Sequence, residues 1–99
     1  MVGFVLGKIA DAAAALEESF QRHAPLNPKK RPKKEDWAAA LERFYGDAAK
    51  IREQFRLGLF ARAGAAYRLQ QRLIAAGYPV DAARQVVFSL VLKVFIGKP

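Results

Sequence analysis

The sequence contains no cysteine and no threonine, only two serines, Ser19 and Ser89, and a single histidine, His23. Without cysteine the chain has neither a disulfide framework nor a thiolate metal site. No Gly-rich phosphate loop, H-x-x-x-H pair or EF-hand pattern is present. A catalytic base needs positioned partners, so we interpret His23 as a surface residue at the end of a helix. The sequence therefore predicts no enzyme activity, no bound metal and no cofactor.

Long apolar runs are also missing. No run reaches the roughly 18 apolar residues that a membrane-spanning helix needs. The first residues, MVGFVLGKIADAAAALEE, have no basic residues ahead of their apolar stretch, and acids follow soon after it. This pattern predicts a structured helix rather than a signal peptide. We expect a cytoplasmic protein without a membrane partner.

The amino-acid composition favours helical structure. Of its 99 residues, 53% are hydrophobic, which is enough to build the core of one domain. Alanine, leucine, arginine and glutamine are plentiful, and these residues lose little rotamer freedom in a helix. We predict a single all-α domain over 1–99, a small bundle of about four helices. It divides into an N-terminal helix within 1–24, a basic, proline-rich linker at 25–34 and a helical core at 35–99.

Apolar periodicity predicts the first two helices. The first covers 3–23, and the second begins after the linker, at about residue 35. Apolar residues of the second helix recur at steps of four and three, as on a face buried in a core. These residues are Trp37, Leu41, Phe44, Ala48, Ile51 and Phe55.

Glycines predict where the later helices are interrupted. Gly58 and Gly64 weaken the continuation of the second helix, so we expect a bend or short break between 57 and 65. A third helix follows, and Gly77 fits a left-handed cap at its C-terminus. A fourth helix is expected over 80–96.

The last helix is unusually apolar. Only Ser89 and Lys93 interrupt the apolar residues of 86–96, VVFSLVLKVFI. A helix that is apolar nearly all round must be buried nearly all round. Two explanations stay open: the core of a monomer, or the interface of a helical homodimer. The interface residues would then be Val87, Phe88, Val91, Leu92 and Phe95.

The charge balance is strongly basic, with 17 Lys and Arg against 9 Asp and Glu and a net charge of +8. Such a charge attracts polyanions at long range. The first 24 residues do not share in it, because they hold Lys8 and Arg22 against Asp11, Glu17 and Glu18. The basic character therefore belongs to the part of the chain after residue 24.

The linker supplies one candidate site for a polyanion. Its basic residues are Lys29, Lys30, Arg31, Lys33 and Lys34. Interleaved prolines keep the segment extended, and each phosphate contact would release counterions. A solvated linker that only separates two helices is the alternative.

Arginines supply a second candidate site. Between Glu53 and Asp81 there is no acidic residue. Arg56, Arg62, Arg68 and Arg72 lie within this interval, and Arg52 and Arg84 flank it. The candidate contacts are Arg52, Arg56, Arg62, Arg68 and Arg72. The planar guanidinium group grips phosphate or carboxylate through paired hydrogen bonds. Tyr45 and Tyr67 are candidates for stacking on bases, and a basic, solvated helix face without a ligand is the alternative.

Taken together, these patterns predict a small, basic, helical protein that acts as a dimer and binds nucleic acid, or has a regulatory role, through phosphate contacts. The alternative is a protein–protein interaction adaptor. In that case its basic face would receive an acidic protein, or its apolar groove a partner helix.

Overall fold

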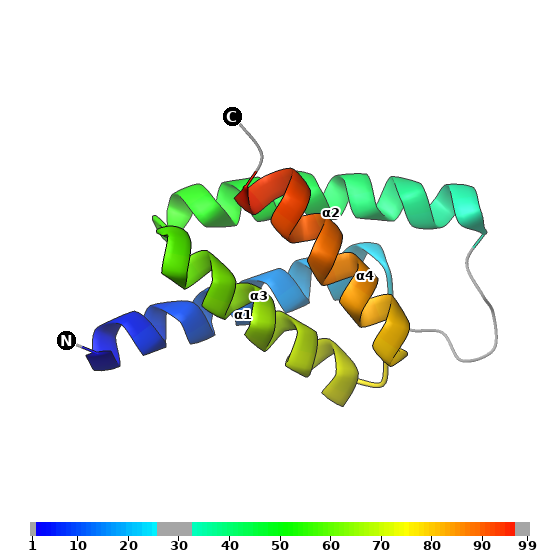
Figure 1. The fold of residues 1–99 in the computed structure, drawn as a ribbon. Coiled ribbons are helices and arrows are strands. Elements are labelled where there is room, and N and C mark those ends of the chain that lie inside the picture. Colours follow the sequence, from blue (N-terminus) through cyan, green and yellow to red (C-terminus); the bar gives the residue numbers. More distant parts are fainter. Residues whose placement is uncertain (1, 26–32, 97–99) are drawn as a thin grey trace.

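The computed structural model describes residues 2–25 and 33–96, with side chains from residue 7 onward, and these residues form a helical bundle without strands (Figure 1). Its helices are α1 (Val2–His23), α2 (Lys34–Gln54), α3 (Leu59–Ala75) and α4 (Val80–Leu90), and a π-helical turn, η1 (Val91–Phe95), continues α4. The predicted all-α fold class is confirmed. Most of the basic linker, including Lys29, Lys30 and Arg31, lies outside the described residues.

α1 packs against both α2 and α3. Its residues Ala12, Leu16 and Phe20 recur at steps of four and are fully buried or nearly so. The approach of α3 is close, because a Cβ atom added to Gly64 would lie 3.1 Å from the Ile9 Cδ1 atom. A side chain at this position would therefore require Ile9 to shift by a few tenths of an ångström.

α2 runs in the opposite direction to α1 along the bundle (Figure 1). Its predicted apolar seam faces the core. Phe44, Ala48 and Ile51 are buried, and the remaining residues of the seam are partly buried against the core: Trp37, Leu41 and Phe55. Helical spacing alone thus identified the buried face of this helix.

The turn between α2 and α3 begins earlier in the chain than predicted. We expected a bend or break within 57–65, but the turn occupies only 55–58. The non-glycine residue Arg56 takes the left-handed conformation there, with φ 51°, and Gly58 precedes the first residue of α3. Gly64 lies inside α3, so it serves close helix packing rather than a bend.

Four aromatic rings join α1, α2 and the α3–α4 turn. The ring of Phe20 meets those of Trp37, Phe44 and Tyr78 edge to face, at centroid distances of 5.9, 5.3 and 5.2 Å. The Tyr78 hydroxyl donates a hydrogen bond to the Ala24 carbonyl oxygen at 2.8 Å. Such edge-to-face pairs stabilise a core beyond the area that they bury, so this cluster is the centre of the fold.

The α3–α4 turn follows the predicted cap. Gly77 has φ 109°, the left-handed conformation that favours glycine. The Tyr78 N–H donates to the Leu73 carbonyl oxygen at 3.1 Å, and the Gly77 N–H donates to that of Ile74 at the same distance. This pattern ends α3 and directs Tyr78 into the core.

The C-terminal helix changes geometry at Val91. The Ile96 N–H donates to the Val91 carbonyl oxygen at 2.8 Å, a π-type bond between residues five apart. The wider turn keeps both Val94 and Phe95 on the buried side. No helix in the described part of the chain is both long enough and apolar enough to cross a bilayer.

Candidate nucleic-acid interface

The two linker bases that the structure describes lie at the start of α2. Lys33 and Lys34 are exposed there, beside the equally exposed Glu35 and Asp36. The acids belong in the first turn because negative charge is favourable at a helix N-terminus. Lys33 and Lys34 therefore face solvent but contribute little net charge at this end of α2.

Two of the five predicted arginines are engaged inside the bundle. Arg52 donates through Nη1 to the Val94 carbonyl oxygen. Arg62 donates through Nη1 to that of Phe95 at 2.7 Å and through Nε to that of Leu57 at 2.8 Å. The first two acceptors lie at the end of η1, where carbonyl groups lack helical partners and carry partial negative charge. Arg52 and Arg62 thus fasten the C-terminal turn to α2 and α3. Because their guanidinium groups are bonded to the chain itself, they are not part of the candidate interface.

Arg56 is displayed at the α2–α3 turn. Its backbone carbonyl oxygen accepts a hydrogen bond from the Lys8 Nζ at 2.9 Å, which holds the turn against α1. Its guanidinium group is exposed and makes no hydrogen bond or ion pair with a described residue. Arg56 is therefore free to contact a ligand.

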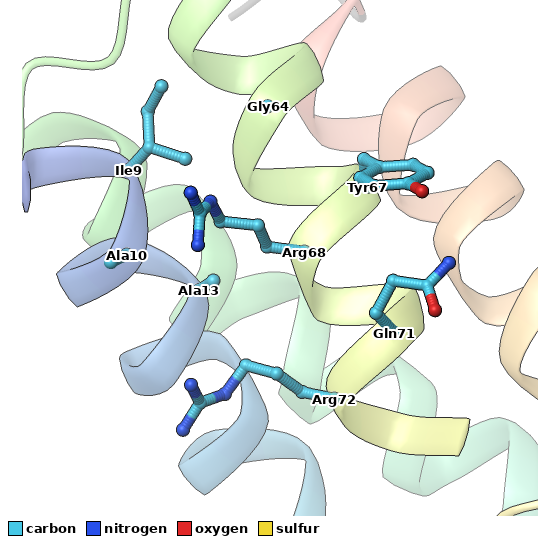
Figure 2. A pocket seen from close by; sticks show the side chains of 8 residues that line it. All are labelled: Ile9, Ala10, Ala13, Gly64, Tyr67, Arg68, Gln71 and Arg72. Atoms are coloured by element: carbon cyan, nitrogen blue, oxygen red, sulfur yellow. The ribbon is translucent and has the colours of Figure 1, made fainter. Parts of the chain in front are cut away.

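Arg68 and Arg72 stand one turn apart on α3 and reach toward α1 (Figure 2). The Arg72 Nε donates to the Glu17 Oε1 at 2.7 Å. Arg68, one turn earlier, has no such partner among the described residues, although it is exposed in the same way. One arginine of this pair is thus neutralised by α1 and the other is not.

A shallow, open depression of about 470 Å³ lies between α1 and α3 beside these arginines. Small and apolar side chains of α1 and α3 form one part of its lining, and polar side chains of α3 form the other. The lining residues are Ile9, Ala10, Ala13, Gly64, Tyr67, Arg68, Gln71 and Arg72. Figure 2 shows Arg68 and Arg72 directed toward α1 and Tyr67 with Gln71 on the opposite side of α3.

Two aromatic side chains of α3 are exposed. Tyr67 is 65% exposed and Phe60 is 90% exposed. They are seven residues apart, so they share one helix face at a separation of about 10 Å along the axis. Tyr45, the other predicted stacking residue, is buried, and the Lys93 Nζ lies 5.4 Å from its ring centroid.

Phe60 was not identified from the sequence as an exposed aromatic residue. A signal for it exists, because a residue nine positions before Leu69 lies on the opposite side of an α-helix. Leu69 is fully buried in the core, so Phe60 has to face outward.

Charge is distributed differently on the two sides of the bundle. The exposed face of α2 mixes both signs, with Glu42 and Glu53 beside Arg43 and Lys50. α3 contains no acidic residue at all. The unbalanced positive charge of the described residues therefore lies at α3 and the turn before it.

The predicted dimer interface is divided by the fold. Val87 and Phe95 are buried in the chain's own core, and Val91 is partly buried against it. Phe88 and Leu92 are exposed on one face of the C-terminal helix. A partner could reach only this outer part of the predicted interface without unfolding the helix.

A polar cluster connects α1 with α2. The Ser19 Oγ and the His23 Nε2 each lie 2.9 Å from the Asp47 Oδ2, and an Arg22 Nη2 lies 3.6 Å from the same oxygen. In a Ser–His–Asp triad the imidazole lies between the hydroxyl and the carboxylate. Here the carboxylate lies between them, and Ser19 is fully buried. The cluster joins two helices rather than presenting a nucleophile.

The pKa of Asp47 is lowered from its ordinary value of 3.8, chiefly by the hydrogen bond from His23 and then by that from Ser19. Because the folded pKa lies below the unfolded one, the carboxylate stabilises the fold above pH 3.8. This contribution is lost as the pH falls through the folded pKa. Replacing Asp47 by Asn should cost about 1–3 kcal/mol of unfolding free energy at pH 7, measured by urea denaturation.

The control for this prediction is Glu42→Gln, which removes an exposed carboxylate that makes no ion pair with a described residue. The difference between Asp47→Asn and the unmodified protein should shrink as the pH is lowered below 3.8. If the two variants track each other at every pH, the cluster makes no contribution to stability.

Comparisons with known proteins identify no similar protein. No family model matches the chain, and no curated protein or solved structure is significantly similar to it. The part of the chain that the structure describes contains no group of three or more His, Asp or Glu residues that could hold a metal ion.

Proposed function

We propose that this protein binds nucleic acid through phosphate contacts made by α3 and the turn before it. The observation that carries the proposal is a pair of exposed arginines, Arg56 and Arg68, without a partner among the described residues. They lie in a stretch with no acid between Glu53 and Asp81. A surface of this kind attracts phosphates from a distance and binds them on contact.

The other bases have distinct places in this proposal. Arg72 keeps one side open to a ligand, although its Nε is bonded to Glu17. Lys33 and Lys34 are exposed at the far end of α2, and with the linker bases they would add contacts to a longer nucleic acid. Arg68 and Arg72 lie within α3, so a helix of the bundle sets their positions.

The test is the salt dependence of binding to labelled single-stranded and duplex oligonucleotides, followed by fluorescence anisotropy. Each phosphate contact contributes about 0.9 to the slope of log affinity against log salt for duplex DNA and about 0.7 for single strands. The double variant Arg56→Ala/Arg68→Ala removes two contacts, so it should lower the slope by about 1.4 for single strands and about 1.8 for duplex, and weaken binding at low salt.

A matched control removes two charges elsewhere. Arg43 and Lys50 are exposed on the mixed face of α2, and Arg43→Ala/Lys50→Ala changes the net charge equally. The control should leave the salt slope almost unchanged. Undetectable binding of the unmodified protein at low salt, or an equal loss in both double variants, would refute the proposal.

A second candidate function has its own observation. Phe88, Leu92 and Ile96 are large, exposed and apolar on the C-terminal helix, which favours a protein partner or a second copy of the chain. In an antiparallel pair of copies, Asp81 at one end of the helix would approach Lys93 of the other copy. Under this alternative nucleic acid does not bind, and sedimentation equilibrium gives twice the 11.0 kDa of one chain.

A further inference from the structure

α1 and α3 pack side by side, and the positions that meet are spaced equally along the two helices. Ile9 contacts the position of Gly64, and Glu17, eight residues later, is paired with Arg72, eight residues after Gly64. The two helices therefore run in the same direction, and Arg68 stands at the level of Ala13. Arg72 is paired with a carboxylate of α1, whereas no acidic side chain of α1 lines the depression beside Arg68.

The surroundings of Arg68 suit an anion supplied from outside. The α1 side of the depression is lined by Ile9, Ala10 and Ala13, so it carries no charge. Arg68 is exposed and has no partner among the described residues. A phosphate there would take the place that Glu17 takes for Arg72, with the paired hydrogen bonds that a guanidinium group offers.

The neighbouring side chains suit a base. Tyr67 precedes Arg68 in the chain and lines the same depression, but its side chain lies on the side of α3 away from α1 (Figure 2). It is 65% exposed, so its ring is open to stacking by a base that reaches across α3. Gln71, one turn after Tyr67, can both donate and accept a hydrogen bond at a base edge. Stacking on an aromatic ring needs a base that is not already stacked and paired in a duplex.

We propose that the depression and the adjacent exposed surface of α3 form a subsite for one unpaired nucleotide, which crosses α3 with its phosphate on Arg68 and its base on Tyr67. The protein consequently prefers single-stranded nucleic acid to duplex. This inference rests on the proposed function and specifies its substrate class.

The experiment compares binding of a single-stranded pyrimidine oligonucleotide with binding of a duplex of equal length at one salt concentration. Tyr67→Ala should weaken single-strand binding by about 5- to 150-fold, the usual range for loss of one stacked base. Duplex binding should change less than about twofold, because phosphate contacts are retained. Tyr67→Phe keeps the ring and should keep the affinity.

A second variant supplies the missing carboxylate. Ala10 is only partly buried, so Ala10→Glu places an acid beside Arg68 without filling the core. It should weaken single-strand binding more than Ala39→Glu does, the same charge change on the exposed surface of α2. Circular dichroism checks that both variants stay helical.

The outcomes separate the two proposals. The subsite is refuted if Tyr67→Ala weakens single-strand and duplex binding equally, or if it weakens neither. The proposed function still stands in that case, provided that Arg56→Ala/Arg68→Ala lowers the salt slope. The same conclusion follows if Ala10→Glu and Ala39→Glu behave alike. If the unmodified protein binds neither oligonucleotide, both proposals are refuted.

Discussion

Replacing Phe20 by alanine should lower the unfolding free energy by about 3–5 kcal/mol, as large-to-small substitutions of buried aromatic residues do. The Phe20 ring is almost fully buried and meets the rings of Trp37, Phe44 and Tyr78 edge to face. Truncation would remove all these contacts and leave a cavity among three elements of the fold. Small domains have only about 5–15 kcal/mol of stability, so the loss should be evident in the denaturant midpoint.

The same substitution at an exposed site provides the control. Phe60 is 90% exposed, and Phe60→Ala should change stability by about 0.5 kcal/mol or less. Guanidinium denaturation followed by circular dichroism would measure both variants. Equal effects at the two positions would show that the aromatic cluster is not the centre of the core.

Replacing both Arg52 and Arg62 by methionine should cost about 3–5 kcal/mol of stability. A hydrogen bond from a charged donor contributes about 1.5–3 kcal/mol. Methionine preserves much of the apolar stem but leaves the Val94 and Phe95 carbonyl oxygens without these donors. The two losses should add incompletely, because both arginines hold the same turn of η1.

Local exchange would show where the stability is lost. Amide hydrogen exchange should accelerate first in α4 and η1, because their carbonyl anchors are removed, while α1 and α2 keep more protection. Arg43→Met is the control, since Arg43 is exposed and makes no ion pair with a described residue. Should the double variant match this control in both measurements, the arginines do not fasten the C-terminal turn.

The arginines in and beside the acid-free interval have different surroundings in the fold. Arg52 and Arg62 bind carbonyl groups of the chain itself, so their charges serve folding. Arg56 and Arg68 are exposed without partners among the described residues, so their charges serve the proposed ligand. Stability measurements should respond to the first pair, and the salt slope of binding should respond to the second.

The amino-acid sequence by itself determined the helical fold class, the buried seam of α2 and the cap at Gly77. Each of these depends on the spacing or the backbone freedom of residues close together in the chain. The excess of basic residues after position 24 was also visible, because it requires only counting.

Only the tertiary structure decided which arginines turn inward, that Gly64 is a packing contact rather than a hinge, and that Asp47 binds His23. Local spacing cannot distinguish Arg62 from Arg68, since both lie on the same basic helix. Their roles differ because Arg62 reaches a carbonyl group at the end of η1, whereas Arg68 lines an open depression against α1 and has no partner among the described residues. Contacts of this kind join residues far apart in the chain, and they follow from how the helices pack.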